Sequence, residues 1–145
     1  MSYKISIVHA DASTGKLTLE PNDTVYVDKG KRVVWSISET VLNVDSFKID
    51  KKSRSEEIFT FLDRPPHNYT KKGGGTVGWF TRDRAEYEYS IDWIDTDENK
   101  HTHDPKISVN PSDDDDYMKV FIGLAVALFA AMLTFGFVQR KRSRK

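Results

Sequence analysis

The chain has 145 residues, with 22 basic and 22 acidic side chains and no cysteine. The lack of cysteine excludes disulfides, thiolate nucleophiles and thiolate metal sites. Six of the 22 basic residues lie at position 119 or beyond, whereas all 22 acidic residues lie before it, so residues 1–117 carry a net charge of about −6. This balance argues against nucleic acid as a partner, because binding to phosphates requires a basic surface.

Residues 1–110 show the alternation of apolar and polar side chains that is typical of β-strands, and few helical stripes compete with it. We expect strands at residues 4–10, 17–19, 24–27, 33–37, 46–49, 57–61, 76–80, 87–93 and 106–110. A region of this length forms one domain around one core. The sequence therefore predicts an all-β domain over residues 1–110, folded as an antiparallel Greek-key β-sandwich of about eight strands.

The sequence KKGGG at residues 71–75 is expected to be a glycine-rich connection between two strands. A nest that binds a phosphate is the alternative, but the segment precedes a strand rather than a helix. Trp35, Trp79 and Trp93 are expected in the core as strand aromatics. His9 alternates with isoleucines, which predicts a partly buried packing residue.

Residues 19–35, which include the run TVYVDKGKRVVW, resemble the second and third strands of cupredoxins. Residues 87–91 (YEYSI) and 104–110 (DPKISVN) are similar to the Tyr-x-Tyr strand and the closing strand of the same family. The resemblance covers about 100 residues and implies a cupredoxin-like sandwich with a copper site for electron transfer. A blue copper site needs a cysteine thiolate. Ile91 stands near the position of that ligand, so the resemblance leaves the scaffold without the copper chemistry.

Histidines offer the other route to a metal site. His101 and His103 would point to one face of an extended segment, and Asp104 or His67 could add a third ligand. The spacing is not specific, and the acidic surroundings favour solvated loop residues. We therefore expect no bound cofactor.

No catalytic constellation can be identified. Ser36 and Ser38 lie on a predicted strand with no histidine nearby, and no spacing separates an acid–base pair of carboxylates from a solvated face. We therefore expect no enzymatic activity.

The C-terminal part of the chain divides into three segments. Residues 111–117 form an acidic linker, and residues 118–138 contain the uncharged 19-residue run VFIGLAVALFAAMLTFGFV. As a helix this run is roughly 28 Å long, close to the hydrocarbon thickness of a bilayer, so we expect a single transmembrane helix. A basic tail, residues 139–145, follows. Its charged side chains are Arg140, Lys141, Arg142, Arg144 and Lys145.

Gly123, Ala127 and Ala131 recur at four-residue steps within the apolar run. Small side chains in one stripe allow two helices to approach closely in a bilayer. The stripe predicts self-association, and a plain monomeric anchor is the alternative.

The sequence gives two conflicting signals about which side of the membrane the domain faces. Residues 1–30 have no apolar segment of the kind found in signal peptides, which favours a cytoplasmic domain. The basic tail favours the opposite orientation, because short basic segments remain on the cytoplasmic side. We prefer the cytoplasmic domain, since export of more than a hundred residues without a leader is the harder step.

These expectations leave three classes of function. The first is a single-pass, membrane-anchored and non-catalytic interaction or effector module that binds a partner or ligand and self-associates through its helix. The second is an accessory or scaffold subunit of a larger membrane complex. The third is an exported metal-handling domain, which the missing cysteine disfavours.

Overall fold

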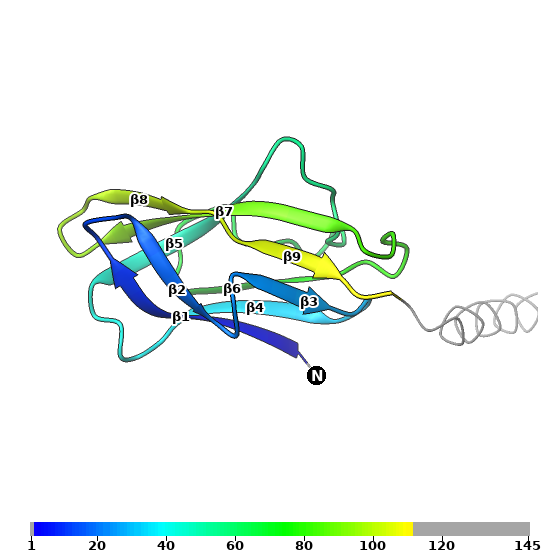
Figure 1. Cartoon of the computed structure of the whole chain (residues 1–145), viewed down its shortest axis with the longest axis horizontal. Helices are drawn as coiled ribbons and strands as arrows, with labels where there is room; N and C mark the ends of the chain where they lie inside the picture. Colours follow the sequence, from blue (N-terminus) through cyan, green and yellow to red (C-terminus); the bar gives the residue numbers. More distant parts are fainter. Residues whose placement is uncertain (1, 112–145) are drawn as a thin grey trace, which may run out of the picture. The chain divides into compact units, whose positions relative to one another are not determined.

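The computed structural model describes residues 2–111, which form two β-sheets around one core (Figure 1). The first sheet has the order β2-β1-β4-β6, and its strands are β1 (Ser2–Asp11), β2 (Lys16–Glu20), β4 (Arg32–Ile37) and β6 (Lys72–Thr76). The second has the order β3-β9-β7-β5, and its strands are β3 (Thr24–Val27), β5 (Val44–Lys51), β7 (Glu86–Asp95) and β9 (Lys106–Val109). A further strand, β8 (Lys100–His103), pairs with β7. The expected all-β, sandwich-like fold is confirmed.

The expectation of purely antiparallel sheets is wrong. Strand β1 runs parallel to β4, with Ile5 opposite Trp35, and β3 runs parallel to β9, with Val25 opposite Ile107. After the β1–β2 hairpin the chain crosses to the second sheet as β3 and returns as β4 beside β1. Side-chain alternation reports which face of a strand is buried, but it is the same in parallel and antiparallel pairs.

The core is built on aromatic side chains from both sheets. Trp35 of β4 and Tyr89 of β7 are fully buried, and the Trp35 Nε1–H donates to the Tyr89 hydroxyl at 3.1 Å. The Phe59 ring lies 6.0 Å from Trp35 and 5.0 Å from Tyr87. Such pairs stabilise a fold by about 0.5–1.5 kcal/mol beyond the area they bury. Trp35 and Trp93 are core residues as expected.

The glycine segment is a strand rather than a connection. β6 pairs with β4 along its length, and it contains Gly73, Gly74 and Gly75 because other groups pack directly on it. A side chain at Gly73 would overlap the Pro66 ring, and a Cβ at Gly75 would lie 2.7 Å from the Phe59 ring. Glycine is thus required here for close packing rather than for a turn.

Three other local expectations are wrong. Apart from Thr76, the last residue of β6, residues 57–61 and 76–80 are not strands but two adjacent segments joined by one bridge, between Phe59 and Val77. Trp79 is half exposed. His9 is exposed because an irregularity after Ile7 shifts the register of β1, so that Ala10 takes the buried position.

We expect a chain that ends at residue 112 to fold on its own. The described core lies within Met1–Pro111, which forms one compact unit, and loss of a segment that makes few core contacts leaves the remainder stable. The measurement is circular dichroism with a thermal melt. A melt without a cooperative transition would show that the C-terminal segment is part of the fold.

We expect Gly75→Ala to destabilise this domain by about 1–3 kcal/mol, because the new methyl group meets the buried Phe59 ring and the backbone of Pro65. Lys72→Ala on the same strand is the control, since Lys72 is exposed and such changes stay within about 0.5 kcal/mol. Thermal melts of both variants give the comparison. Equal stability would mean that the residues over β6 shift without cost.

Candidate functional site

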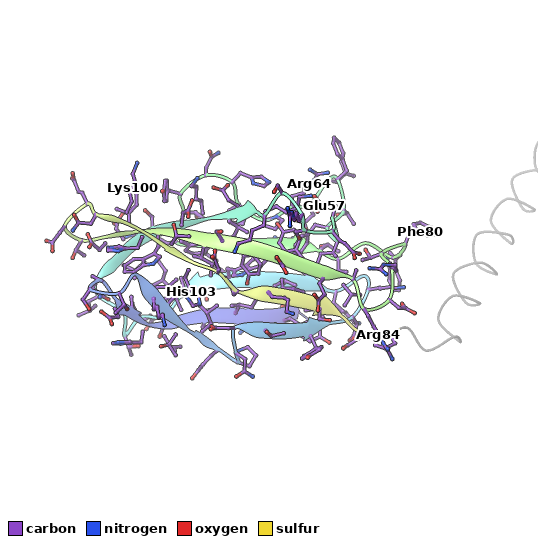
Figure 2. The ribbon with its side chains drawn as sticks, turned by 45° about the horizontal axis from the view of Figure 1, so that its top comes forward. Glu57, Arg64, Phe80, Arg84, Lys100 and His103 are labelled. Atoms are coloured by element: carbon purple, nitrogen blue, oxygen red, sulfur yellow. The ribbon has the colours of Figure 1, made fainter. Side chains whose placement is uncertain are left out.

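An open groove of about 390 Å³ lies between residues 57–60 and residues 78–81. We call it the end groove, because it lies at the end of the domain where Phe80 and Arg84 are seen (Figure 2). Lys100 marks the opposite end in the same view. Most of the lining is apolar side chain or backbone, and its polar side chains are Glu57, Thr60 and Thr81.

The first wall of the end groove is held by the core. Ile58 and Phe59 are buried, and they pull residues 57–60 onto the sandwich. The Ile58 carbonyl accepts hydrogen bonds from the Gly78 amide at 2.7 Å and from the Thr81 hydroxyl at 3.1 Å. The two walls are therefore tied to each other as well as to the fold.

The second wall is held by the turn between β3 and β4. Val77 is fully buried, its amide donates to the Lys31 carbonyl and its carbonyl accepts from the Gly30 amide, both at 2.9 Å. Gly30 has φ +72°, and a Cβ there would overlap the Trp79 indole. Glycine is thus required at position 30 both for the left-handed backbone of the turn and for the close packing of the Trp79 indole on it. The indole therefore lies against the turn and is half exposed.

Exposed apolar side chains gather around the end groove. Phe61 is 83% exposed, Leu62 93%, Trp79 50% and Phe80 86%. Phe61 and Leu62 lie at the tip of a turn closed by the Asp63 amide and the Thr60 carbonyl at 3.2 Å. Within residues 2–111 only three other large apolar side chains are exposed: Tyr26, Leu42 and Tyr69. A cluster of this kind is typical of a binding surface.

Charges around the end groove are mostly paired. Arg82 forms an ion pair with Glu56, Lys29 lies 2.5 Å from Asp83, and Arg64 lies 4.0 Å from Glu57. The Arg64 guanidinium also lies over the Phe61 ring, 5.5 Å from its centroid. The pairing leaves a nearly neutral rim around an apolar groove.

Arg84 differs from its neighbours. It is exposed and forms none of the ion pairs found among residues 2–111. Its backbone has φ 58°, in the left-handed region, and its amide donates to the Val109 carbonyl at 2.9 Å. The loop that carries Phe80 is thereby fixed against the last strand.

The described chain ends beside the end groove. The Asn110 amide donates to the Val27 carbonyl at 2.8 Å, and its side chain donates to Asp28 at 2.7 Å. The Tyr3 hydroxyl donates to the other oxygen of the same carboxylate at 2.6 Å. Both bonds lower the pKa of Asp28, the one from Asn110 most. The charged carboxylate thus fastens the exit point of the chain to the turn that seats Trp79.

The sequence indicated that the two candidate metal ligands are solvated loop residues, and this expectation is wrong. His101 and His103 lie on β8 with largely buried imidazoles. Each faces a different carboxylate: His101 Nε2 lies 2.9 Å from Asp95, and His103 Nε2 lies 3.2 Å from Asp23. In the part of the chain that the structure describes, no three His, Cys, Asp or Glu side chains converge on one point.

Asp95 is the centre of the β7–β8 connection. It is buried and accepts from the backbone amides of Asp97 at 2.9 Å and Asn99 at 2.8 Å, and from the Asn99 side chain at 3.1 Å. The hydrogen bond with His101, joined by these others, lowers the pKa of Asp95 to about 2. The His101 ring stacks on Trp93 at 4.2 Å. The histidine thus packs the edge of the sandwich.

The other residues considered for metal are engaged elsewhere. Asp104 accepts from Lys52 at 2.8 Å and from Ser90 at 2.7 Å. Ile91, at the position of the cupredoxin cysteine, is fully buried on β7. These positions serve packing and surface ion pairs.

The sequence did not predict the end groove. The sequence predicts strands at residues 57–61 and 76–80, because both segments carry aromatic and β-branched side chains. A signal was nevertheless present. The pairs Phe61-Leu62 and Trp79-Phe80 each place two large apolar side chains side by side, and a strand with one solvated face alternates instead.

The remaining predicted residues lie outside the described part of the chain. They are Gly123, Ala127 and Ala131 of the small-residue stripe and Arg140, Lys141, Arg142, Arg144 and Lys145 of the basic tail, together with the proposed membrane helix. Residues 2–111 contain no helix with the length and apolar character needed to cross a bilayer.

Comparisons with known protein families and with curated proteins give no match. The cupredoxin resemblance is therefore supported only as far as a β-rich domain of two sheets. Among solved structures, the 2,6-sialyltransferase of Photobacterium sp. JT-ISH-224, in a complex with CMP and lactose, is similar to 75% of this chain with 9% identity and a TM-score of 0.43. The similarity covers 18% of that enzyme. A similarity this weak supports no argument about fold or function.

We expect Asp95→Asn to lower stability at neutral pH and to lose this effect in acid. With its pKa lowered to about 2 from an ordinary value near 3.9, Asp95 stabilises the fold fully above about pH 4 and less as the pH falls towards 2. Urea unfolding of the domain at several pH values should show the gap to wild type closing over this range.

Asp97→Asn is the matched control, because Asp97 is exposed in the same turn. It should follow the wild type at every pH. A gap for Asp95→Asn that stays constant down to pH 2 would mean that the carboxylate is not held charged by its neighbours.

Proposed function

We propose that the chain is a single-pass, membrane-anchored β-sandwich that acts as a non-catalytic interaction module and engages its partner through the end groove. The observation that carries this proposal is one preformed groove lined by the exposed Trp79 and Phe80, with the exposed Phe61 and Leu62 directly following its first wall in the chain. Keeping four such side chains in water is unfavourable, since burial of each is worth about 1.5–3 kcal/mol. A partner that covers them recovers that free energy.

The rigidity of the walls supports binding at this site. Ile58, Phe59 and Val77 are buried below the groove, and Trp79 rests on Gly30. The exposed side chains are therefore presented by a fixed backbone, which reduces the entropy lost when a partner binds.

The polar side chains of the groove support a binding role rather than a catalytic one. Its lining provides one carboxylate, Glu57, and the hydroxyls of Thr60 and Thr81. The Thr81 hydroxyl donates to the Ile58 carbonyl, and the Glu57 carboxylate accepts from the Phe59 amide at 3.2 Å. A nucleophile activated by an adjacent base, which covalent catalysis requires, is not formed by these groups.

Membrane anchoring rests on residues 120–138, an uncharged run of the length of one transmembrane helix. Within it, the stripe of Gly123, Ala127 and Ala131 supports self-association. Several copies of the domain would then present their end grooves together. The overall avidity for a partner then exceeds the affinity of a single groove.

We expect the full chain to float with phospholipid vesicles and to resist extraction by alkaline carbonate, whereas a chain ending at residue 112 stays in the soluble fraction. The physical reason is that residues 120–138 are apolar enough to remain in the hydrocarbon. Release of the full chain by carbonate would contradict the anchor.

We expect replacement of Gly123, Ala127 and Ala131 by Leu to weaken self-association while insertion is kept, because bulky side chains prevent close approach of two helices. Crosslinking in membranes measures the change. Ala125→Leu combined with Ala130→Leu is the control, since it adds the same kind of bulk on another face. Equal crosslinking of both variants would favour a monomeric anchor and the accessory-subunit alternative.

A further inference from the structure

We propose that the partner of the end groove is the bilayer surface itself: Trp79 and Phe80, which line the groove, insert at the lipid headgroup level and hold the domain end-on against the membrane. This inference rests on the membrane anchoring proposed above and adds the lipid surface as the ligand of the site.

The first argument is the place where the chain leaves the domain. Asn110 forms hydrogen bonds with Val27 and Asp28, and the Val109 carbonyl accepts one from the Arg84 amide. Asp28 begins the turn that packs on Trp79, and Arg84 follows Phe80 in the same loop, so the exit point lies at the end that carries Trp79 and Phe80. Nine residues, 111–119, separate it from the apolar run, and they span at most about 30 Å when fully extended. If residues 120–138 form the anchor proposed above, a linker of this length keeps the end groove within about 30 Å of the bilayer.

The opposite end of the domain does not share this position. Strand β7 has ten residues, which corresponds to roughly 33 Å. Strand β4 leads from Arg32, beside the end groove, to Ile37 at the far end, and the next loop carries Leu42 there. The Asn43 side chain donates to the Ala10 carbonyl at 2.9 Å, which fixes this loop against β1. Leu42 is 83% exposed and stands about one strand length farther from the exit.

The second argument is the chemistry of the exposed side chains. Tryptophan prefers the interface between water and hydrocarbon, where its apolar ring and its polar N–H are both accommodated, and Phe and Leu side chains enter the acyl boundary beside it. Trp79 and Phe80 project from one loop, and Phe61 and Leu62 from the tip of a neighbouring turn. Arg84 is exposed and lies at the same end of the domain as Phe80 (Figure 2), where a lipid phosphate could pair with it.

The third argument is shape. The exposed rings stand at the tips of two loops rather than on a flat face, and the groove between them is open. A soft interface admits projecting side chains without a matching surface, whereas a folded protein partner must supply a complementary one. Because the charges on the rim are mostly paired, little electrostatic selectivity for a protein remains.

The absence of cysteine makes a direct test possible. Phe80→Cys and Leu42→Cys each introduce a single thiol at sites with almost equal exposure, 86% and 83%, at opposite ends of the domain. Each full-length variant carries an environment-sensitive fluorophore on that thiol and is reconstituted in phosphatidylcholine vesicles. Part of the lipid carries a spin-label quencher at a shallow depth of the acyl chain.

Docking predicts a blue-shifted emission and several-fold stronger quenching by the spin-labelled lipid for the label at position 80 than for the label at position 42. Vesicle flotation of the same samples reports the anchor separately. Chains that do not float contradict the proposed function, whereas chains that float with both labels equally in water contradict the docking alone.

Two further outcomes would overturn the inference. A label at position 80 that is shielded but not quenched by lipid, with shielding that rises with protein density, indicates a second copy of the chain in the groove. A shielded label that needs an added membrane protein indicates an accessory subunit.

An unlabelled measurement guards against disturbance by the fluorophore. Trp35 and Trp93 are fully buried, and Trp79 is half exposed, so quenching of tryptophan emission by brominated lipid reports mainly on Trp79. We expect brominated lipid to quench the tryptophan emission of the wild type, several-fold less quenching in Phe80→Asp and the same quenching as wild type in Leu42→Asp. Equal quenching in all three would contradict it.

Discussion

The close packing of residues 58–66 against the glycine strand is the contact on which the rest of this domain depends. Gly73 and Gly75 leave room for the Pro66 ring and the Phe59 ring, and Phe59 then completes the aromatic core with Trp35 and Tyr87. The same contact fixes Ile58, whose carbonyl binds both ends of the opposite wall. A side chain on this strand would lift the first wall, open the core and widen the end groove together.

A second constraint joins both ends of the described domain to the end groove. The Asp28 carboxylate receives hydrogen bonds from Tyr3 on the first strand and from Asn110 after the last one. Asp28 also begins the turn in which Gly30 seats Trp79. The point where the chain leaves the domain is thereby coupled to the orientation of the exposed indole. Tension on the linker would act first on this group of bonds.

Sequence reasoning predicted the elements that follow local rules and missed those that long-range contacts impose. Alternation located most of the nine strands, and the burial of Trp35 and Trp93 followed from it. The parallel direction of β1 and β4 is not encoded in either strand. A triple glycine reads as a turn, and only the proline-rich segment that packs on it makes it a strand. The acidic segment beside His101 and His103 indicates solvated loop residues, and the sequence does not show that Asp95 and Asp23 are their partners.

The candidate site shows how folding and binding are divided between the two sides of one pair of segments. Ile58, Phe59 and Val77 face inward and are buried, while Phe61 and Phe80 face outward within three residues of them. Because the buried residues and the hydrogen bonds of the Ile58 carbonyl hold the backbone, the exposed ones can be changed with little effect on stability. That division explains why the apolar pairs break the alternation of a strand. Phe61 and Leu62 are both exposed, whereas the neighbouring pair Ile58 and Phe59 is buried, so the first pair adds nothing to the core that the second one forms.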